Sequence, residues 1–554
     1  MRTLLSMWLV AATALSSAAA QTTTLISVSS AGVQGDETSG PGGVSADGRF
    51  VVFASFASTL VLGDTNGDSD IFVRDTLTGL TERASVAADG SQVTGNSSYP
   101  TISADGRYVA FASDGADLVP GTVPPDGSRQ IYRKDRLTGA VALVSVSPTG
   151  EPANLGAGIY SRSAISADGN VVAFESRATN LMPGTTIDQV YVRDMTTGIT
   201  VCVSVSPAGE KGAGPSKSPS LSANGRRIAF SSSASNLGPV DGTPGVYGSD
   251  VFVRDLDAGT TEAVSVSSAE VPADGNSVEP FLSADGLTVA FQSLASNLAP
   301  LDVIGDDIFV RDLAAGTTVR ITNDQYGGSA NGNAQRVHMS RDGRWVIFQS
   351  SVENLVPDDT NGESDIFLHD RHTGITERVS VTDAGAQLEK GNPSRDGFVS
   401  DDGRRVVFDS SADALVAFPI TSETHVFLRD LGPWTNEGFG LAGLSGKPSL
   451  VGQGSLQAGS PGSLALAQAA PYAPAMMFVS LSSSPKPFKG GTLVASPVVS
   501  LIALATNGAG KVALPFTWPA GIPSETALWF QVAIHDWVAS SDVALSNGVK
   551  AVTP

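Results

Sequence analysis

Hydrophobic and polar residues alternate in short runs along most of the chain, and glycine-containing turns separate the runs. "DIFVRD" (residues 70–75) and "TERVSV" (residues 376–381) are examples, rich in the residues that strands favour. Glycine suits the turns because it tolerates a positive φ, and an aspartate that opens a turn can bond the backbone two residues on. The composition, with 60 glycines and 16% charged residues, agrees with many tight turns. The pattern predicts an all-β protein.

One unit of about sixty residues is repeated seven times. Each copy contains Ser-x-(Asp/Asn)-Gly, then a phenylalanine five positions after the glycine and a serine two positions after that. Successive copies are 56 to 63 residues apart. The first serines are Ser45, Ser103, Ser166, Ser222, Ser283, Ser340 and Ser400, and the phenylalanines are Phe53, Phe111, Phe174, Phe230, Phe291, Phe348 and Phe408. Agreement in all seven copies identifies an internal repeat.

A second signature in each copy is an aromatic residue three positions before an aspartate. The residue directly before that aspartate is basic in every copy, for example Arg74 before Asp75. Each copy therefore contains two strands joined by the Asp-Gly turn, a third strand through the second signature, and a fourth after the next turn. Four antiparallel strands repeated seven times predict a seven-bladed β-propeller over residues 21–431.

The last copy lacks its fourth strand, because the chain after Asp430 reads "LGPWTNEGFG". A matching segment stands near the other end, where "TTTLISVSS" (residues 22–30) resembles "TEAVSVSS" (residues 261–268). The N-terminal strand is therefore expected to complete the seventh blade. Such closure leaves no open sheet edge between the first and last blades.

The repeats resemble those of the TolB-like propeller family, relatives of the WD-repeat propellers. The resemblance rests on "SADGRFVVF" (residues 45–53), "SADGRYVAF" (residues 103–111) and the "DIFVRD" segment, and it covers roughly residues 22–431. It implies a propeller that binds partners. It transfers no catalytic residue, since the repeated positions are structural.

The two faces of such a propeller differ in their loops. The Asp-Gly hairpins and the turns after the second signature share one face. The connections from strand two to three and from strand four to one share the opposite face, and they are longer and more variable, as in residues 147–163 and 323–336. Variable loops on a rigid scaffold usually carry binding residues, so we expect the long-loop face to contact the ligand.

Two of the long loops place oxygen-bearing residues at alternate positions. The eight candidate metal ligands are Asp64, Asn66, Asp68, Asp70, Asp359, Asn361, Glu363 and Asp365. Calcium prefers such oxygen ligands, and a calcium site is one interpretation; an Asn-Gly turn with solvated acids is the other. An EF-hand is excluded, because Asp75 at its twelfth position recurs in all seven copies and Gly67 stands fourth instead of sixth.

Familiar catalytic motifs are missing from the sequence. It contains no Gly-x-Ser-x-Gly, no His-Glu-x-x-His and no complete Walker A motif. "HDRH" (residues 369–372) has a ligand-like spacing, but His369 only replaces the basic residue of the repeat. We therefore predict a non-catalytic binding or scaffold protein without catalytic or cofactor-binding residues. The alternative is a propeller enzyme that acts on a polysaccharide or ester through loop carboxylates.

Residues 1–20 are typical of an export signal, with a positive charge at Arg2, the apolar segment "LLSMWLVAATAL" and a small-residue cleavage site after Ala20. No later stretch is long enough to cross a membrane. The net charge of −21, without a basic cluster, argues against nucleic-acid binding. The single cysteine, Cys202, predicts stability without disulfides. We expect a monomeric periplasmic or extracellular protein that binds a protein or an envelope glycan.

The composition changes after residue 431, where a linker is expected at residues 432–438. Residues 439–554 contain short alternating runs punctuated by glycine and proline, which predict a small β-sandwich-like domain of six to eight strands. This part resembles the C-terminal module of uncharacterised secreted bacterial proteins, through "WPAGIP" (residues 518–523) and "ALSNGVKAVTP" (residues 544–554), and that resemblance carries no activity. Trp518 and Trp537 are expected to anchor the core of the domain.

Overall fold

The computed structural model describes residues 21–553, except residues 116, 120–126, 159–161, 185, 239–247, 301–304, 325, 331 and 540–541. The expected export signal, residues 1–20, lies outside the described residues. Strands dominate the described chain, alongside one short 3₁₀ helix, η1 (Asp413–Leu415), so the all-β prediction is confirmed. No helix among the described residues is long and apolar enough to cross a membrane.

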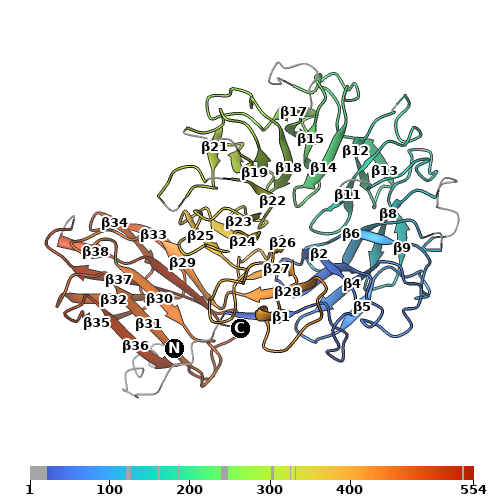
Figure 1. Cartoon of the computed structure of the whole chain (residues 1–554). Helices are drawn as coiled ribbons and strands as arrows, with labels where there is room; N and C mark the ends of the chain where they lie inside the picture. The colour runs from blue at the N-terminus through green and yellow to red at the C-terminus, as the bar shows by residue number, and fades with distance from the viewer. Residues whose placement is uncertain are drawn as a thin grey trace. The chain divides into compact units, whose positions relative to one another are not determined.

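The chain divides into two compact units, an N-terminal unit of Thr23–Arg429 and a C-terminal unit that contains Asp430–Pro554. The N-terminal unit contains seven four-stranded sheets that follow one another in chain order (Figure 1). Sheets one to three contain β2 (Ser39–Val44), β3 (Phe50–Ser55), β4 (Asp70–Asp75) and β5 (Thr81–Arg83); β6 (Ser97–Ile102), β7 (Tyr108–Ser113), β8 (Gln130–Asp135) and β9 (Val141–Leu143); and β10 (Ala164–Ile165), β11 (Val171–Ser176), β12 (Gln189–Asp194) and β13 (Ile199–Cys202).

The remaining four sheets of the N-terminal unit repeat the same strand order. Sheets four to six contain β14 (Ser216–Leu221), β15 (Arg227–Ser232), β16 (Asp250–Asp255) and β17 (Thr260–Ala263); β18 (Ser277–Leu282), β19 (Thr288–Ser293), β20 (Asp307–Asp312) and β21 (Thr317–Arg320); and β22 (Ala334–Met339), β23 (Trp345–Ser350), β24 (Asp365–Asp370) and β25 (Ile375–Arg378). The seventh sheet contains β26 (Ser394–Val399), β27 (Arg405–Ser410), β28 (His425–Asp430) and β1 (Thr22–Leu25).

The seventh sheet joins the two ends of the repeat region. Strand β1 pairs with β28, so the N-terminal segment supplies the fourth strand of this sheet, as the sequence predicts. The Ile26 N–H donates to the Val426 carbonyl at 2.8 Å, and Arg429 donates to the Thr23 hydroxyl at 2.9 Å. Ile26 is buried in one core cluster with Phe53 of sheet one and Phe398 of sheet seven.

The first strands of the seven sheets contact one another in a closed cycle. The contacts run from β2 through β6, β10, β14, β18 and β22 to β26, and β26 contacts β2 again. Backbone hydrogen bonds follow the same cycle at the residue after each repeat serine. The backbone N–H of this residue donates to the carbonyl of the corresponding residue in the next sheet, in five successive steps. The six residues of this series are Ala46, Ala104, Ala167, Ala223, Ala284 and Arg341. The Arg341 N–H donates to the Asp401 carboxylate at 3.2 Å, and the Asp401 N–H donates to Ala46 at 3.0 Å.

The two aromatic residues of each repeat are cross-strand neighbours. In every one of the seven sheets the repeat phenylalanine faces the aromatic residue of the second signature, as Phe53 faces Phe72. The ring centroids are between 5.6 and 6.2 Å apart across the seven pairs. These rings are fully buried, so the repeat signature is largely the signature of a core.

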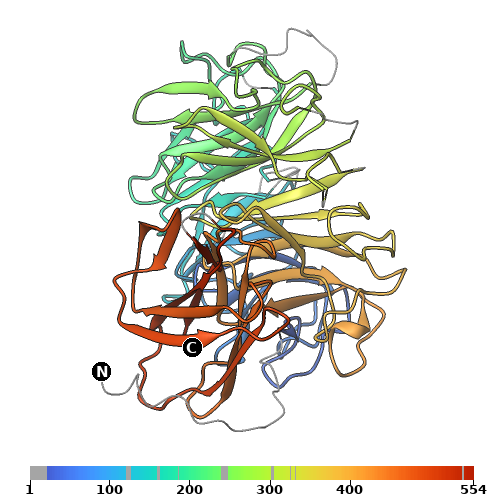
Figure 2. The same cartoon turned by 90° about the vertical axis from the view of Figure 1, so that its left-hand side faces the viewer.

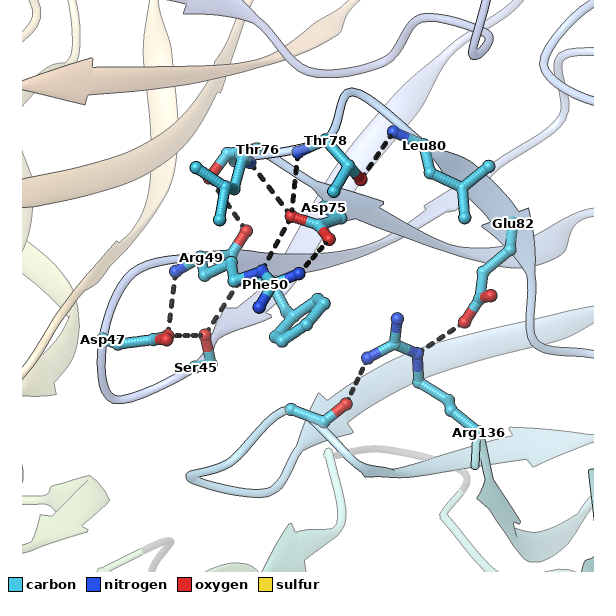
Figure 3. A network of polar contacts seen from close by, with 12 residues as sticks. Ser45, Asp47, Arg49, Phe50, Asp75, Thr76, Thr78, Leu80, Glu82 and Arg136 are labelled. Atoms are coloured by element: carbon cyan, nitrogen blue, oxygen red, sulfur yellow. Dashed lines mark hydrogen bonds and ion pairs between the residues drawn. The ribbon is translucent and has the colours of Figure 1, made fainter. Parts of the chain in front are cut away.

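The repeat aspartate at the end of each third strand holds a turn. Asp75 accepts hydrogen bonds from the backbone N–H groups of Leu77 and Thr78, and Arg49 donates to both of its oxygens at 2.9 and 2.6 Å (Figure 3). The arginine and these bonds hold the pKa of Asp75 well below its ordinary value, with the Arg49 hydrogen bond as the main cause. This supports its assignment as a structural repeat residue.

The glycine of each Asp-Gly turn has a positive φ, and in most sheets it also packs against the preceding sheet. A Cβ on Gly106 would lie 2.2 Å from the Phe50 ring, which the guanidinium groups of Arg49 and Arg136 cover at 4.6 and 4.4 Å (Figure 3). A Cβ on Gly403 would likewise lie 2.2 Å from the Trp345 ring. Glycine therefore allows both the turn and the approach of neighbouring sheets.

Replacing Gly403 by alanine should destabilise the protein more than the same change at Gly374. Both residues have a φ of 72°, so each substitution carries the backbone strain of about 1 kcal/mol. Only at Gly403 would the new Cβ overlap a neighbour, because nothing lies within 4 Å of the Gly374 position. We expect a further loss of about 2 kcal/mol for Gly403→Ala. Urea unfolding of both variants checks this, and equal losses would contradict the packing role.

The C-terminal unit contains three sheets, shown from a second side in Figure 2. The six-stranded sheet contains β29 (Trp434–Gly438), β39 (Gly548–Val552), β37 (Ala527–His535), β32 (Pro474–Ser480) and β35 (Ser500–Ala505) in this order, and β38 (Val543–Leu545) also pairs with β37. The others contain β30 (Ser449–Gln453), β31 (Pro461–Ala467) and β36 (Val512–Thr517), and β33 (Ser483–Phe488) and β34 (Gly491–Ala495). The six- and three-stranded sheets share one hydrophobic core.

Two expectations about the C-terminal region need correction. Residues 434–438, expected in a linker over 432–438, form β29 and belong to the six-stranded sheet, because Trp434 packs against its core. Trp518 is 3% exposed and lies in that core as expected, whereas Trp537 is 76% exposed. Trp537 stands in a turn that Asp536 holds by accepting the N–H groups of Val538 and Leu444, and this turn points the indole outward.

Candidate functional site

A cavity of about 460 Å³ lies where the first strands of the seven sheets meet. Every sheet of the N-terminal unit contributes to its lining, from residues in or next to its first strand. The alanine residues of the hydrogen-bonded cycle also line it. The cavity is therefore the place where side chains from all seven repeats converge.

One position of the first strand is strained in five of the sheets. Tyr99, Ser218, Glu279, Arg336 and Asp396 are each the third residue of their strand and have φ between 48° and 54°. In each of these strands the pairing register shifts at this position, so the residue forms a bulge. Left-handed backbone is unfavourable for such residues, and its recurrence at a cavity points to function. We call this position the bulge position.

Pro41 and Arg162 occupy the bulge position in sheets one and three, since each stands four residues before the repeat serine like the other five. Arg162 connects three sheets: it donates to the Pro41 carbonyl at 2.9 Å and pairs with Asp396 at 3.5 Å. Arg336 donates to the other oxygen of Asp396. The Arg162 guanidinium also covers the Phe398 ring at 4.7 Å.

The charges at the cavity shift one another's ionisation. Burial alone would raise the pKa of Asp396, but Arg162 and Arg336 outweigh it and lower that pKa. Burial raises the pKa of Glu279 despite the nearby Arg336. Burial, with a contribution from Arg162, lowers the pKa of His338 to about 3, so its imidazole is neutral at pH 7. Arg341 and Asp401 also line the cavity, and burial raises the pKa of Asp401 to about 6. The lining thus offers three cations, three carboxylates of unequal acidity and a neutral imidazole.

Asp409 is a further buried carboxylate whose charge interacts with Asp396, Arg162 and Arg336 of this group. Asp409 of β27 is 9% exposed, and its Oδ1 has no hydrogen-bond partner among the residues that the structure describes. Burial first, and then the negative charge of Asp396, raise the pKa of Asp409 to about 7, although Arg336, Arg395 and Arg162 oppose the shift. Asp409 therefore titrates near neutral pH.

The expected metal ligands lie elsewhere, on two long loops, and an arginine stands between the outer carboxylates of each. Arg83 pairs with Asp64 at 3.2 Å and with Asp70 at 2.9 Å. In the second loop Arg378 pairs with Asp359 at 2.9 Å and Asp365 at 3.5 Å. All four carboxylates thus already have a guanidinium as ion-pair partner, although each guanidinium is shared by two of them.

The inner residues of these loops bond to the backbone. Asn66 accepts the Asp68 N–H at 3.2 Å, and Asp68 accepts the Gly95 N–H at 2.8 Å. Asn361 accepts the Glu363 N–H at 3.0 Å, and Glu363 accepts the Gly391 N–H at 2.9 Å. This is the pattern of a turn that is tied to the next loop.

Asp70 and Asp365 also have a repeat role that the sequence did not reveal. In all seven sheets the first residue of the third strand contacts a buried hydroxyl that stands two residues after the fourth strand. In sheet one Ser85 donates to Asp70 at 2.5 Å. The other pairs are Ser145 with Gln130, Ser204 with Gln189, Ser265 with Asp250, Thr322 with Asp307, Ser380 with Asp365 and Ser27 with His425.

No group of three or more His, Cys, Asp or Glu in the described part of the chain is arranged to hold a metal ion. Calcium binding by the two loops stays a prediction. A rise of the melting temperature with calcium that sodium at equal ionic strength does not reproduce, and that Asp64→Ala with Asp359→Ala removes, would establish it.

Several solved structures are similar to this chain at low sequence identity. A proposed TolB of Agrobacterium tumefaciens is 15% identical, with a TM-score of 0.36, over 72% of this chain and 99% of that one. TolB from Acinetobacter baumannii is 14% identical, with a TM-score of 0.33, over 70% and 81%. The Pyrococcus horikoshii acylaminoacyl peptidase is 11% identical, with a TM-score of 0.42, over 77% of this chain and 57% of its own.

No family model matches the chain, and no curated protein matches it in sequence. The structural likenesses have low identities and TM-scores below 0.5, so they assign neither an activity nor a partner. The strand pairing and the cycle of first-strand contacts themselves define a β-propeller protein.

Proposed function

We propose that the seven sheets are the blades of a closed seven-bladed propeller, joined to a β-sandwich-like C-terminal domain, and that the protein is an exported, non-catalytic binding or scaffold protein. Its ligand, a protein or an envelope glycan, contacts the long-loop face and enters the cavity. Export is supported by the sequence of residues 1–20. The TolB-like character of the repeats supports a binding role.

The bulge position is the observation that carries this proposal. The positions that recur in every repeat bond or pack within the scaffold, as Asp75 does with Arg49. The bulge position instead keeps one backbone conformation in five sheets while its side chain changes from tyrosine to serine, glutamate, arginine and aspartate. A scaffold that holds variable side chains around one cavity is the usual design of a binding site.

Exposed apolar side chains lie where long loops begin. Phe56 follows the end of β3 and Leu294 follows the end of β19, and both are about half-exposed. They would give a ligand on the long-loop face apolar contact in addition to the polar cavity.

Binding to the isolated cell-envelope fraction and to a glycan array tests the proposal. The intact protein is compared with Tyr99→Ala and Glu279→Gln, which change the bulge position but keep a similar backbone. Leu137→Ala is the matched control, because Leu137 is exposed on the opposite, short-turn side. We expect binding to weaken about tenfold in the two bulge variants and to stay unchanged in the control. The reverse pattern would contradict the proposed site.

A second candidate function is supported by two of the three cavity carboxylates, Glu279 and Asp396. Burial raises the pKa of Glu279, whereas arginines lower that of Asp396, and carboxyl pairs with divided pKa values serve as acid and base in hydrolases. If the protein is an enzyme that cleaves a polysaccharide or an ester, it should hydrolyse at least one member of a panel of glycans and esters. The Glu279→Gln variant should lose this activity. Unchanged substrates throughout the panel favour the binding protein.

A further inference from the structure

Strand β35 (Ser500–Ala505) is an edge strand of the six-stranded sheet in the C-terminal unit. It pairs with β32 over six residues without a register shift, from Ser500 opposite Val479 to Ala505 opposite Pro474. Its other side pairs with no strand that the structure describes. An unpaired edge offers a row of backbone donors and acceptors to another chain.

The outward groups of this edge belong to alternate residues. The Thr506 N–H donates to the Ala473 carbonyl, so even-numbered residues of β35 bond to β32. The N–H and C=O groups of Leu501, Ala503 and Ala505 therefore point away from the sheet. Their side chains are also exposed, with Leu501 57% exposed.

Four other edge strands of this unit carry features that block strand addition. Strand β29 has a bulge and carries Glu437, and β36 contains Pro515. Strand β33 has a bulge, two prolines and Lys486, and β30 contains Gly452. Proline, charge, bulges and glycine all weaken an edge as a template. Strand β35, with the sequence SLIALA, has none of them.

Charge indicates which partner this edge can accept. Residues 448–485 and 490–510 contain no charged side chain, so both β32 and β35 are uncharged. The C-terminal unit from residue 430 onward has five acidic and five basic residues, and the whole net charge of −21 belongs to the rest of the chain. Two copies can therefore pair at β35 without contact between like charges. A charged partner would find no opposite charge on this edge to increase its affinity.

We propose that two copies of this chain form a symmetric dimer by antiparallel pairing of β35 with its own copy. With the two-fold axis at Ala503, this residue faces itself and Leu501 faces Ala505 of the second copy. The three outward residues on each strand then exchange six backbone hydrogen bonds, and a large side chain lies beside a small one. The contact is self-complementary and closed, as a two-fold interface requires.

Sedimentation velocity of the exported chain from about 1 to about 200 µM tests the dimer, since a short strand contact fits a micromolar dissociation constant. Ala503→Pro removes only an outward N–H, and proline is tolerated in edge strands there. Leu501→Lys adds a charge to the same edge. Each should raise the dimer dissociation constant at least about tenfold. Ala513→Lys, at an exposed position of the β36 edge, is the matched control and should leave the dimer intact.

A cysteine scan tests the register separately from stability. In a Cys202→Ser background, Ala503→Cys should cross-link into a covalent dimer on oxidation, because facing residues of a hydrogen-bonded pair are about 5.5 Å apart between Cα atoms, within disulfide range. In Ala505→Cys the new cysteine faces Leu501 of the second copy, so this variant should form no covalent dimer under the same conditions. A wild-type monomer at the highest concentration, a dimer unaffected by Ala503→Pro, assemblies that grow beyond two, or the opposite cross-linking pattern would each overturn the proposal.

Discussion

Deletion of residues 21–30 should unfold the N-terminal unit under conditions in which the intact protein is stable. The deletion removes β1 and the buried side chains of Leu25, Ile26 and Val28. At about 1.5 to 3 kcal/mol for each buried side chain, the loss of roughly 5 to 9 kcal/mol is comparable to the stability of a whole domain. It also leaves the buried Arg429 without its bond to Thr23.

Thermal and urea unfolding measure this loss, and a synthetic peptide of residues 21–30 added in excess should restore part of it. Two point variants grade the effect within the same strand and its extension. Ile26→Ala should lose about 2 to 4 kcal/mol, whereas Thr24→Ala, at an exposed position, should change little. A truncated protein that melts like the intact one would contradict closure of the ring by this strand.

The second large effect is expected at Asp409, where asparagine should stabilise the protein above neutral pH. The carboxyl of Asp409 is buried, and burial together with Asp396 raises its pKa to about 7. In the unfolded chain its pKa returns to about 3.9. The folded state therefore binds the proton more tightly, so Asp409 makes the protein less stable as pH rises from about 4 to about 7.

Asparagine cannot ionise, so Asp409→Asn lacks this loss. A difference of about three pKa units corresponds to about 4 kcal/mol, which sets the upper limit of the gain at pH 8. Near pH 4 the two proteins should differ little. Urea unfolding at both pH values checks the prediction, with Asp257→Asn, an exposed residue of an ion pair outside the cavity, as control. A gain of equal size at pH 4 and pH 8 would show that the effect is not titration.

The sequence predicts the repeated strands well because each repeat carries its own local instructions. The serine, the Asp-Gly turn and the two aromatic residues appear in every copy, and the structure uses them for a turn and a stacked pair in every sheet. The missing fourth strand after Asp430 was visible by counting strands. These features depend on residues close in sequence, where spacing carries the information.

The candidate site could not be predicted in the same way. The bulge residues stand four positions before each repeat serine, but nothing local shows that Arg162 reaches Asp396, 234 residues further on. The ion pairs of the cavity form only because the first strands of distant repeats meet there. The ion pairs of the acidic loops are hidden for a related reason: "DTNGDSD" offers the oxygens that calcium prefers, and Arg83, which pairs with Asp64 and Asp70, lies in the next strand.

The exposed Trp537 illustrates a third kind of limit. Apolar residues on alternating runs usually belong to a core, and Trp518 does. Trp537 follows β37 in a turn whose direction depends on Asp536 accepting the N–H of Leu444, which is distant in sequence. Strand β37 ends at His535, two residues before Trp537, so the alternation of the strand does not extend to this side chain.

The pairing of β1 with β28 brings the two ends of the N-terminal unit side by side on neighbouring strands. The same sheet-to-sheet contacts recur around the cycle, so the scaffold has little physical reason to prefer this place for its ends. A circularly permuted gene of the N-terminal unit, opened between two other sheets and joined here by a short linker, should encode the same seven sheets. The positions of the two ends are then a matter of connectivity and not a requirement of the scaffold's stability.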